Sequence, residues 1–565
     1  MCLSSVRLDT IFKKRGFLYN FRPPYATIRA SSIITFEKHI TSCEIFFYLF
    51  RLTWMHRFRN SDTIRTMKLK LLLSLLTFGL CAAESTPPNI IFILADDMGY
   101  GDVQCLNPER GKIKTPHMDR LAQEGMIFTD AHTTSSVCTP TRYSLMTGRY
   151  NWRTKLQDLV TWGYSKALIS ADTLTVGQTL QRSGYQTAMI GKWHIGMTLP
   201  TTDGVLPTGR NAKKTTLDWK GKIEEGPADR GFDYFFGIAA SLDMAPYIYI
   251  ENRHFIGEAD NNKPNAPAAG FKHVDVLPEF GRRSAEYITN HDGQKPFFLY
   301  VPLTSPHTPI VPTPEWRGKS GINPYADFQM QTDHIVGQIT QAVDQAGIAE
   351  NTLIIVSADN GCSKAANFKA LEKAGHFASA QYRGSKADLW EGGLRVPFIV
   401  RWPQVIKPNS VCDQTICFTD FLATCAEISG YDIPETQAPD SVSFLPALKG
   451  EEIVSSRKGI VSHSISGHFA YRMGDWKLLL AKGSGGWTSP REHEIPNDAP
   501  KAQLYNLAED PGEQNNLYLE KPEIAEKLYA QLILEIENGR STAGPKLAND
   551  IPHDQIKLWK GNVQR

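Results

Sequence analysis

Two pairs of oxygen-bearing side chains each follow an apolar stretch of the sequence. Asp96 and Asp97 end the first pattern, and Asp359 and Asn360 come soon after another. If both stretches are strands of one sheet, their carboxyl ends lie together, and the four side chains offer the oxygen ligands that Ca²⁺ or Mg²⁺ prefers. Acidic pairs also form turns and N-caps, so each pair alone favours that structural role.

A cysteine lies at the start of a predicted helix. The segment begins Cys138-Thr-Pro-Thr-Arg142 and continues to Gly148. Pro140 is typical of the first turn of a helix and Gly148 of its end, so we expect Cys138 at the helix N-terminus. The backbone amides and the helix dipole there favour an anion. A buried structural thiol is the commoner role of a lone cysteine.

Three further segments bring cations and imidazoles to loop positions. Lys192 and His194 follow a predicted strand, His307 lies in a loop stiffened by two prolines, and Lys386 lies in a short glycine-containing turn. A lone histidine is usually a satisfied hydrogen-bonding residue, and a lysine in a turn is usually solvated. Taken singly, none of these residues identifies a site.

The elements that must position these residues alternate between apolar strand runs and helical patterns, which is typical of an α/β domain. The predicted strands are 89–94, 126–128, 186–190, 297–301, 353–356 and 396–400, and the predicted helices are 115–125, 173–182 and 325–346. A Pro-rich stretch near 434–446 predicts a domain boundary. Beyond it, strand patterns at 459–462, 468–472 and 476–480 precede a helix at 523–537, which predicts a smaller α+β domain.

Composition bounds the class of protein. The chain has 565 residues, 41% hydrophobic and 21% charged, which predicts a folded protein with more than one structural unit. The formal net charge is +2, but residues 84–565 carry 48 Lys and Arg against 55 Asp and Glu. We therefore expect no basic surface for nucleic acid.

Residues 67–83 have the layout of a secretory signal peptide. Met67 opens a short basic segment, an apolar run follows, and the small residues around Ala83 suit cleavage. We expect translation to start at Met67, which makes residues 1–66 a misassigned extension; a genuine extension is the alternative. A lipoprotein with Cys81 as its lipidated residue is disfavoured by the bulky Leu80 before it. The apolar run is too short for stable membrane insertion.

Two observations on residues 84–565 bear on the compartment of the exported protein. Residues 84–565 contain six cysteines, which could pair as disulfides, and no Asn-x-Ser/Thr sequence. The second observation favours a bacterial source, so we expect a secreted or periplasmic bacterial protein.

The segment Cys138-x-Pro140-x-Arg142, followed by Thr147-Gly148-Arg149, resembles the signature of the formylglycine-dependent sulfatases, the arylsulfatase type within the alkaline-phosphatase superfamily. The other segments described above occur in the family's order, so the resemblance covers about residues 89–520. It implies a large, mixed, mostly parallel sheet sandwiched by helices over residues 84–440. A smaller α+β domain with an antiparallel sheet would follow over residues 441–565.

The resemblance also implies a set of roles. Cys138 would be oxidised to formylglycine by a formylglycine-generating or anaerobic sulfatase-maturating enzyme, and its hydrate would be the nucleophile. One metal ion, usually calcium with magnesium as the alternative, would be held by Asp96, Asp97, Asp359, Asn360 and the modified Cys138. Arg142, Lys192 and Lys386 would surround the sulfate. His194 would be the base that regenerates the aldehyde, and His307 or Lys386 the acid for the leaving group.

The implied activity is hydrolysis of sulfate monoesters in a small molecule or a saccharide. One alternative is a phosphoesterase or phosphonate hydrolase of the same superfamily. Another is a catalytically silent, secreted carbohydrate-binding protein in which Cys138 is never converted. The substrate itself is not indicated, although the insertions 201–230 and 241–272 would shape the pocket.

Overall fold

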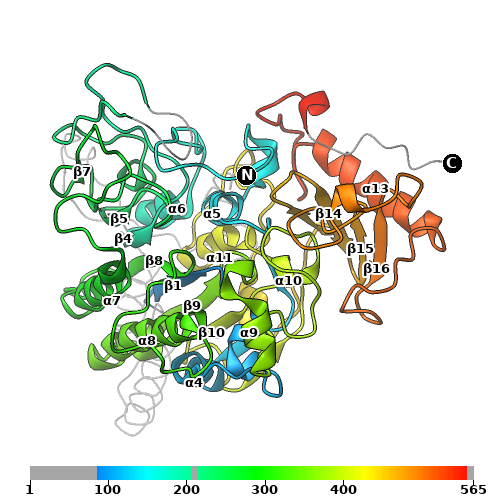
Figure 1. The fold of residues 1–565 in the computed structure, drawn as a ribbon, viewed down its shortest axis with the longest axis horizontal. Coiled ribbons are helices and arrows are strands. Elements are labelled where there is room, and N and C mark those ends of the chain that lie inside the picture. Colours follow the sequence, from blue (N-terminus) through cyan, green and yellow to red (C-terminus); the bar gives the residue numbers. More distant parts are fainter. Residues whose placement is uncertain (1–85, 207–213, 557–565) are drawn as a thin grey trace, which may run out of the picture. The chain divides into compact units, whose positions relative to one another are not determined.

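The computed structural model describes residues 86–206 and 214–556 (Figure 1). They belong to one compact unit that begins at Thr86. The predicted extension (1–66) and signal peptide (67–83) lie outside the described residues. Within the described ranges, no helix has the length and apolar character needed to span a membrane.

Ten strands form the main sheet, in the order β11-β2-β10-β9-β1-β8-β4-β5-β6-β7. The central strands β9, β1, β8, β4 and β5 are parallel, whereas β10 and β6 pair antiparallel to their neighbours. The predicted mixed, mostly parallel sheet is thus confirmed. The strands are β1 (Asn89–Asp96), β2 (Met126–Phe128), β4 (Gln186–Lys192), β5 (Tyr234–Ile238), β6 (Ile250–Glu251), β7 (His254–Phe255), β8 (Phe297–Pro306), β9 (Thr352–Ala358), β10 (Phe398–Arg401) and β11 (Ser410–Cys412). A separate parallel pair joins β3 (Ala131–His132) to β12 (Ile416–Cys417).

Helices cover both faces of this sheet (Figure 1). α7 and α8 pack on β8, and α4 packs on α8 and β10; α5, α6 and α11 pack together on the opposite face. The helices are α4 (Pro116–Glu124), α5 (Cys138–Thr147), α6 (Val176–Arg182), α7 (His273–Thr289), α8 (Pro324–Gln345), α9 (Phe368–Lys373), α10 (Glu391–Leu394), α11 (Asp420–Ser429), α12 (Leu445–Leu448) and α13 (Pro522–Glu537). Short 3-10 turns lie at Tyr100–Asp102, Gln104–Leu106, Asn151–Arg153, Pro227–Asp229, Ala349–Asn351, Lys364–Ala366, Glu492–Glu494 and His553–Gln555.

Burial on both faces explains why the central strands are almost continuously apolar. Every residue of β8 and β9 is buried, and Phe92 of β1 packs against Phe421 of α11 with 4.7 Å between ring centroids. The register brings the strand ends together, since Ala95 pairs with Ala358 and Asp96 with Pro306. The residues that follow β1, β8 and β9 therefore meet at one edge of the sheet.

The predicted antiparallel sheet lies towards the C-terminus, and it has a fourth strand, β16, that the sequence did not indicate. Its strands are β13 (Ile460–His463), β14 (Phe469–Met473), β15 (Trp476–Leu479) and β16 (Gln503–Asn506), and α13 packs on β14 and β15. Trp152 from the α5–α6 connection shares its core and contacts the ring of Phe469. The α5–α6 connection thus shares a hydrophobic core with the C-terminal sheet.

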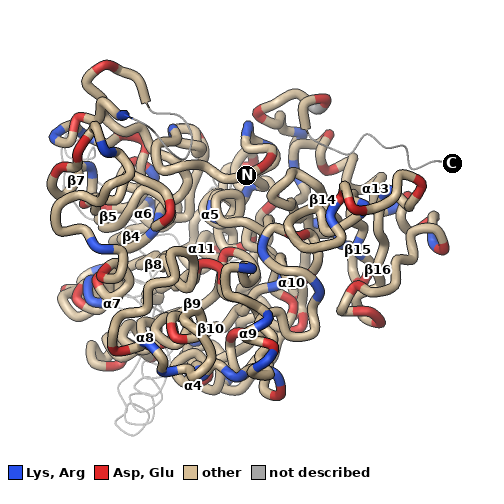
Figure 2. The backbone as a smooth tube through the Cα atoms, viewed as in Figure 1, with Lys and Arg blue, Asp and Glu red and all other residues tan. Residues whose placement is uncertain are grey.

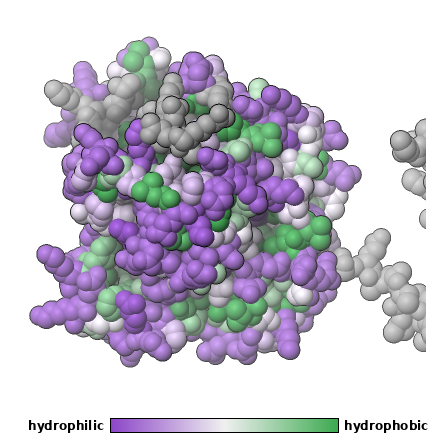
Figure 3. All heavy atoms as spheres, turned by 90° about the vertical axis from the view of Figure 1, so that its right-hand side faces the viewer, coloured by the Kyte–Doolittle hydropathy of each residue, from purple (hydrophilic) through white to green (hydrophobic). Residues whose placement is uncertain are grey.

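The surface carries both signs of charge. Lys and Arg are interspersed with Asp and Glu over the molecule in Figure 2, and the face in Figure 3 is mainly hydrophilic with hydrophobic side chains in separate groups. All six cysteines of the described part carry free thiols, so the disulfides that the sequence left open are not formed there.

Candidate active site

The ten predicted site residues are all buried near the carboxyl edge of the central strands. None is more than 6% exposed. Asp96 ends β1 and Asp97 follows it, Lys192 ends β4, and Asp359 follows β9. Burial contradicts the reading of Lys386 as a solvated turn residue: its ammonium lies 2.6 Å from Asp97 Oδ1 and its side chain is 6% exposed.

The carboxylates of the site are paired with the side chains of lysine, arginine and asparagine residues. Lys192 Nζ lies 2.6 Å from Asp96 Oδ2, and Asn360 Nδ2 donates to Asp97 Oδ1 at 2.8 Å. Burial opposes ionisation of the Asp96 carboxyl, but the charges of Lys192, His307 and Arg142 outweigh it and hold the pKa of Asp96 below its ordinary value. The burial of Lys386 is likewise outweighed by Asp97, which raises the Lys386 pKa.

Helix α5 places Cys138 and Arg142 one turn apart. It begins at Cys138 and is capped by Gly148 in the left-handed conformation (φ 62°), where a Cβ would approach Ala438 Cβ to 2.8 Å. Arg142 donates Nε and Nη2 to Asp359 Oδ2 at 2.9 and 2.7 Å, and its Nη1 donates to the Lys192 carbonyl. Burial and the charge of Asp96 raise the pKa of Asp359 to about 6. The arginine thus ties the helix to two strand ends.

The Cys138 thiol lies among charged groups. Its Sγ, one oxygen of Asp96 and one oxygen of Asp359 all lie within 4.8 Å of one another. Burial raises the pKa of the Cys138 thiol to about 11, so an unmodified thiol here is neutral near pH 7. The thiolate, not the thiol, is the nucleophile, so the side chain as encoded is poorly suited to attack.

His194 is held as a neutral imidazole. Burial, with the charges of Lys192 and Arg142, lowers its pKa well below the ordinary value. Its Nε2 lies 2.8 Å from the Thr161 carbonyl oxygen, which only accepts, so the proton is on Nε2. Nδ1 is buried and has no hydrogen-bond partner among the described residues. The lone pair on Nδ1 of His194 can therefore accept a proton.

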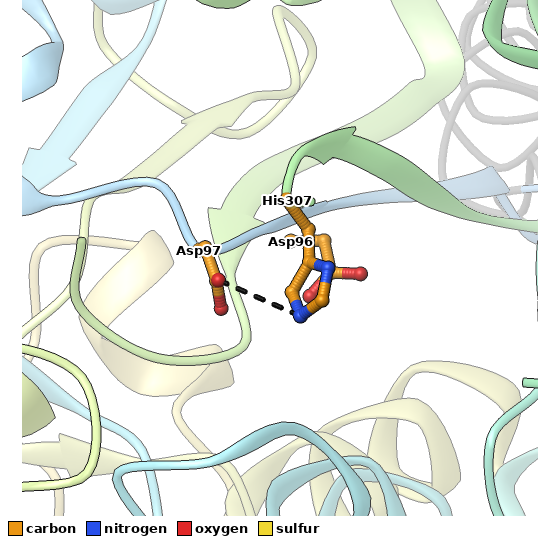
Figure 4. Close-up of side chains that lie close together, drawn as sticks. All are labelled: Asp96, Asp97 and His307. Carbon is orange, nitrogen blue, oxygen red and sulfur yellow. Dashed lines mark ion pairs between the residues drawn. The ribbon is translucent and has the colours of Figure 1, made fainter. Parts of the chain in front are cut away.

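His307 has the opposite arrangement (Figure 4). Its Nδ1 lies 2.7 Å from the Thr308 carbonyl oxygen and so carries a proton. Its Nε2 lies 3.6 Å from Asp97 Oδ2. Asp96, Asp97 and His307 also place one ligand atom each within 4.8 Å of one another. Nε2 is thus the atom available to exchange a proton with a bound molecule.

The acidic residues suit a hard divalent cation. Asp96 Oδ1 and Asn360 Oδ1 are buried acceptors without a hydrogen-bond partner in the described part of the chain. A buried polar oxygen left unpaired is costly, and oxygens of this kind are ligands that Ca²⁺ and Mg²⁺ take. Arg142, Lys192 and Lys386 already balance the three carboxylates, so a cation would leave the site positive towards an anion.

Two site residues adopt a backbone conformation that non-glycine residues rarely use. Asp97 has φ 67° and His194 has φ 55°. Such residues cost free energy and cluster at functional sites, because the surrounding structure must hold them there. Asp97 directly follows β1, and His194 lies two residues after the end of β4.

Two groups at the site were not singled out from the sequence. Ser241 Oγ lies 3.1 Å from His307 Nδ1, and the Thr161 carbonyl orients His194. Ser241 follows β5 by three residues, so the rule that functional side chains follow strands could have found it. Thr161 acts through its backbone oxygen, for which the sequence carries no signal.

Comparisons with known proteins identify the family of this chain. A family model described as Sulfatase matches residues 88–431, and one described as N-sulphoglucosamine sulphohydrolase, C-terminal, matches residues 385–541. N-acetylgalactosamine-6-O-sulfatase of Bacteroides thetaiotaomicron is 32% identical over 79% of this chain and 92% of its own length. Arylsulfatase A of Homo sapiens is 30% identical over 79% of this chain and 86% of its own length.

A solved structure has the same fold over most of the chain. It is described under "Metabolism of multiple glycosaminoglycans by bacteroides thetaiotaomicron", and it matches with a TM-score of 0.69 at 30% identity. The match covers 80% of this chain and 99% of that chain. The chain belongs to the sulfatase family, whose members are sulfuric ester hydrolases.

Proposed function

We propose that this sulfatase cleaves sulfate monoesters with a formylglycine made from Cys138 and a divalent cation, Ca²⁺ or Mg²⁺. The observation that carries the proposal is the grouping of Cys138 Sγ with Asp96 and Asp359 oxygens, all within 4.8 Å of one another. Asp96, Asp97, Asp359 and Asn360 would hold the cation. The hydrated aldehyde would supply one hydroxyl to accept the sulfuryl group and a second to expel it, while the cation would supply positive charge.

The cationic side chains bind the sulfate oxygens. Arg142, Lys192 and Lys386 are buried and already fixed by carboxylates, so they require little reorganisation when charge develops on the sulfuryl group. Exclusion of water from this pocket strengthens each of these interactions.

The histidines move protons at different atoms. His194 is neutral with an open Nδ1, so it accepts a proton from a hydroxyl during the release of sulfate. His307 keeps Nδ1–H on the Thr308 carbonyl and delivers a proton from Nε2 to the departing alcohol. Ser241 keeps the His307 ring in position.

The substrate is a sulfated small molecule or saccharide. One relative, named N-acetylgalactosamine-6-O-sulfatase, supports the saccharide. The mature enzyme requires a formylglycine-generating or anaerobic sulfatase-maturating enzyme, and the signal-peptide layout of residues 67–83 supports export from a bacterial cell.

Release of sulfate tests the proposed activity directly. Protein matured in a converting host is expected to hydrolyse 4-nitrophenyl sulfate faster than 4-nitrophenyl phosphate. Sulfate is measured by ion chromatography and nitrophenol by absorbance. Removal of the cation with a chelator should abolish turnover, and Ca²⁺ or Mg²⁺ should restore it. Faster hydrolysis of the phosphate ester would instead indicate a phosphoesterase.

Substitution of His307 by alanine tests the assignment of the acid. A good phenolic leaving group departs without a proton, whereas an alkyl or sugar alcohol needs one. We therefore expect His307→Ala to reduce kcat/KM most for alcohols of high pKa and least for nitrophenol. A series of substituted phenyl and alkyl sulfates gives the slope, and His254→Ala, at an exposed histidine of β7, is the control. Equal losses across the series would remove His307 as the acid.

A further inference from the structure

The second residue of α5 is hydrogen-bonded to the residue that holds His194. Thr139 Oγ1 lies 3.1 Å from Thr161 Oγ1 and accepts the Thr161 N–H at 3.2 Å. Thr161 in turn contacts His194 twice: its hydroxyl donates to the His194 carbonyl at 3.2 Å, and its own carbonyl oxygen lies 2.8 Å from His194 Nε2. Thr139 and His194 are fully buried, and Thr161 is 8% exposed. The start of α5, which carries Cys138, is thus joined to the imidazole through Thr161.

Each hydrogen bond of this chain has a fixed direction. A hydroxyl has one hydrogen, and Thr161 uses its own on the His194 carbonyl, which only accepts. Thr139 is therefore the donor in the contact between the two hydroxyls, while its oxygen accepts the Thr161 N–H. Without the Thr139 hydroxyl, a buried N–H and a buried hydroxyl oxygen of Thr161 would lose their partner. Buried polar groups left unpaired are costly, so the loss would favour a displacement of Thr161.

His194 depends on Thr161 for its position. It has φ 55°, a conformation that a non-glycine residue keeps only where its surroundings hold it. The Thr161 carbonyl fixes the ring proton on Nε2 and leaves Nδ1 without a partner among the described residues. Thr161 itself lies in the irregular segment between α5 and α6, so its carbonyl is not fixed by the register of a sheet.

We propose that Thr139 is a positioning residue for the release of sulfate: its hydroxyl holds Thr161, and Thr161 holds His194 Nδ1 towards position 138. The inference rests on the proposed function, in which His194 is the base. In that step Nδ1 takes the proton of the free hydroxyl at position 138, and the O–H electron pair forms the C=O bond. The C–O bond to sulfate breaks, and its electrons leave on the sulfate. Thr139 acts only through Thr161.

The test separates sulfate release from sulfuryl transfer in matured enzyme that hydrolyses 4-nitrophenyl sulfate. The rate constant for release is kcat divided by the fraction of enzyme that carries sulfate at saturation, which peptide mass spectrometry measures. We expect Thr139→Val to lower this rate constant by about tenfold and to leave kcat/KM unchanged, because nitrophenol departs before His194 acts. Thr139→Ser, which keeps the hydroxyl, should restore release. All rates are referred to the formylglycine content of each preparation.

Further variants keep the result independent of the conversion of Cys138, whose signature includes position 139. Thr161→Val lies outside that signature and removes the same contact between hydroxyls, so it should slow release to a similar extent. The double variant should be no slower than the slower single variant, because both hydroxyls belong to one chain of hydrogen bonds. In a His194→Ala background, Thr139→Val should slow release no further.

Thr424→Val is the matched control. The fully buried Thr424 hydroxyl donates to the Asp420 carbonyl at 2.8 Å and accepts the Phe444 N–H at 2.9 Å, so the variant loses the same kinds of hydrogen bond outside the site. Its melting temperature should fall about as much as that of Thr139→Val, with sulfate release unchanged.

Two results would overturn the inference. One is a Thr139→Val enzyme with the kcat and the sulfated fraction of the wild type. The other is a loss of kcat/KM as large as the loss in the release rate constant, which would mean that Thr139 only supports the fold of the site. A wild type that cleaves no sulfate ester would instead contradict the proposed function.

Discussion

Replacement of Asp359 by asparagine is expected to lower kcat/KM for a sulfate ester by at least about a thousandfold. Asp359 provides a ligand of the proposed cation and accepts two hydrogen bonds from the fully buried Arg142. Asparagine keeps the volume of the side chain and one acceptor oxygen. It removes the negative charge that holds Arg142 and the proposed divalent cation. We expect the variant to fold and to lose bound Ca²⁺ or Mg²⁺, measured by elemental analysis after dialysis, together with its activity.

A matched buried pair separates this effect from loss of stability. Arg153 donates Nε and Nη2 to Asp440 at 2.9 and 2.7 Å, and both side chains are fully buried outside the site. Truncation of a buried ion-pair partner costs on the order of 3–5 kcal/mol of folding stability. Asp440→Asn should therefore lower the melting temperature at least as much as Asp359→Asn, yet retain metal and activity per folded molecule. An Asp359→Asn enzyme with full metal content and turnover would contradict the proposed cation site.

Local signals in the sequence were sufficient to predict the strands and the helix that carry the site residues. The apolar runs predicted β1, β4, β8 and β9, because strands covered on both faces must be apolar throughout. Pro140 and Gly148 predicted both ends of α5, which begins at Cys138 as expected. These features depend on a few neighbouring residues, so a single sequence contains them.

Features that depend on residues far apart in the sequence were either not predicted or predicted too short. The predicted strand 297–301 continues as β8 to Pro306, although prolines normally mark strand ends, because neighbouring strands hold it extended. The two-residue strands β6, β7 and β12 exist only through their pairing. Lys386 was a predicted site residue with a solvated turn as the alternative, and only the approach of Asp97, which follows β1, shows that its ammonium is buried and paired. The same holds for Ser241 beside His307.

Cys138 is expected to carry the aldehyde in active protein and to be indispensable for repeated turnover. Peptide mass spectrometry of protein matured in a converting host should find formylglycine at position 138. Cys138→Ser, produced in a host whose converting enzyme accepts only cysteine, should fold and retain the cation, because serine is nearly isosteric with the buried thiol. Its sulfate release should stop at no more than one equivalent per enzyme, since a sulfated serine has no second hydroxyl to expel sulfate.

Cys417 provides a control that shares the physical state of Cys138 but not its surroundings. Both thiols are 2% exposed, and burial raises the pKa of each to about 11. Cys417 lies in β12 near Asp420 and Arg457, without the carboxylates of the site. We therefore expect position 417 to stay a thiol and Cys417→Ser to keep multiple turnover. An active enzyme that turns over repeatedly with unmodified Cys138 would refute the proposed mechanism.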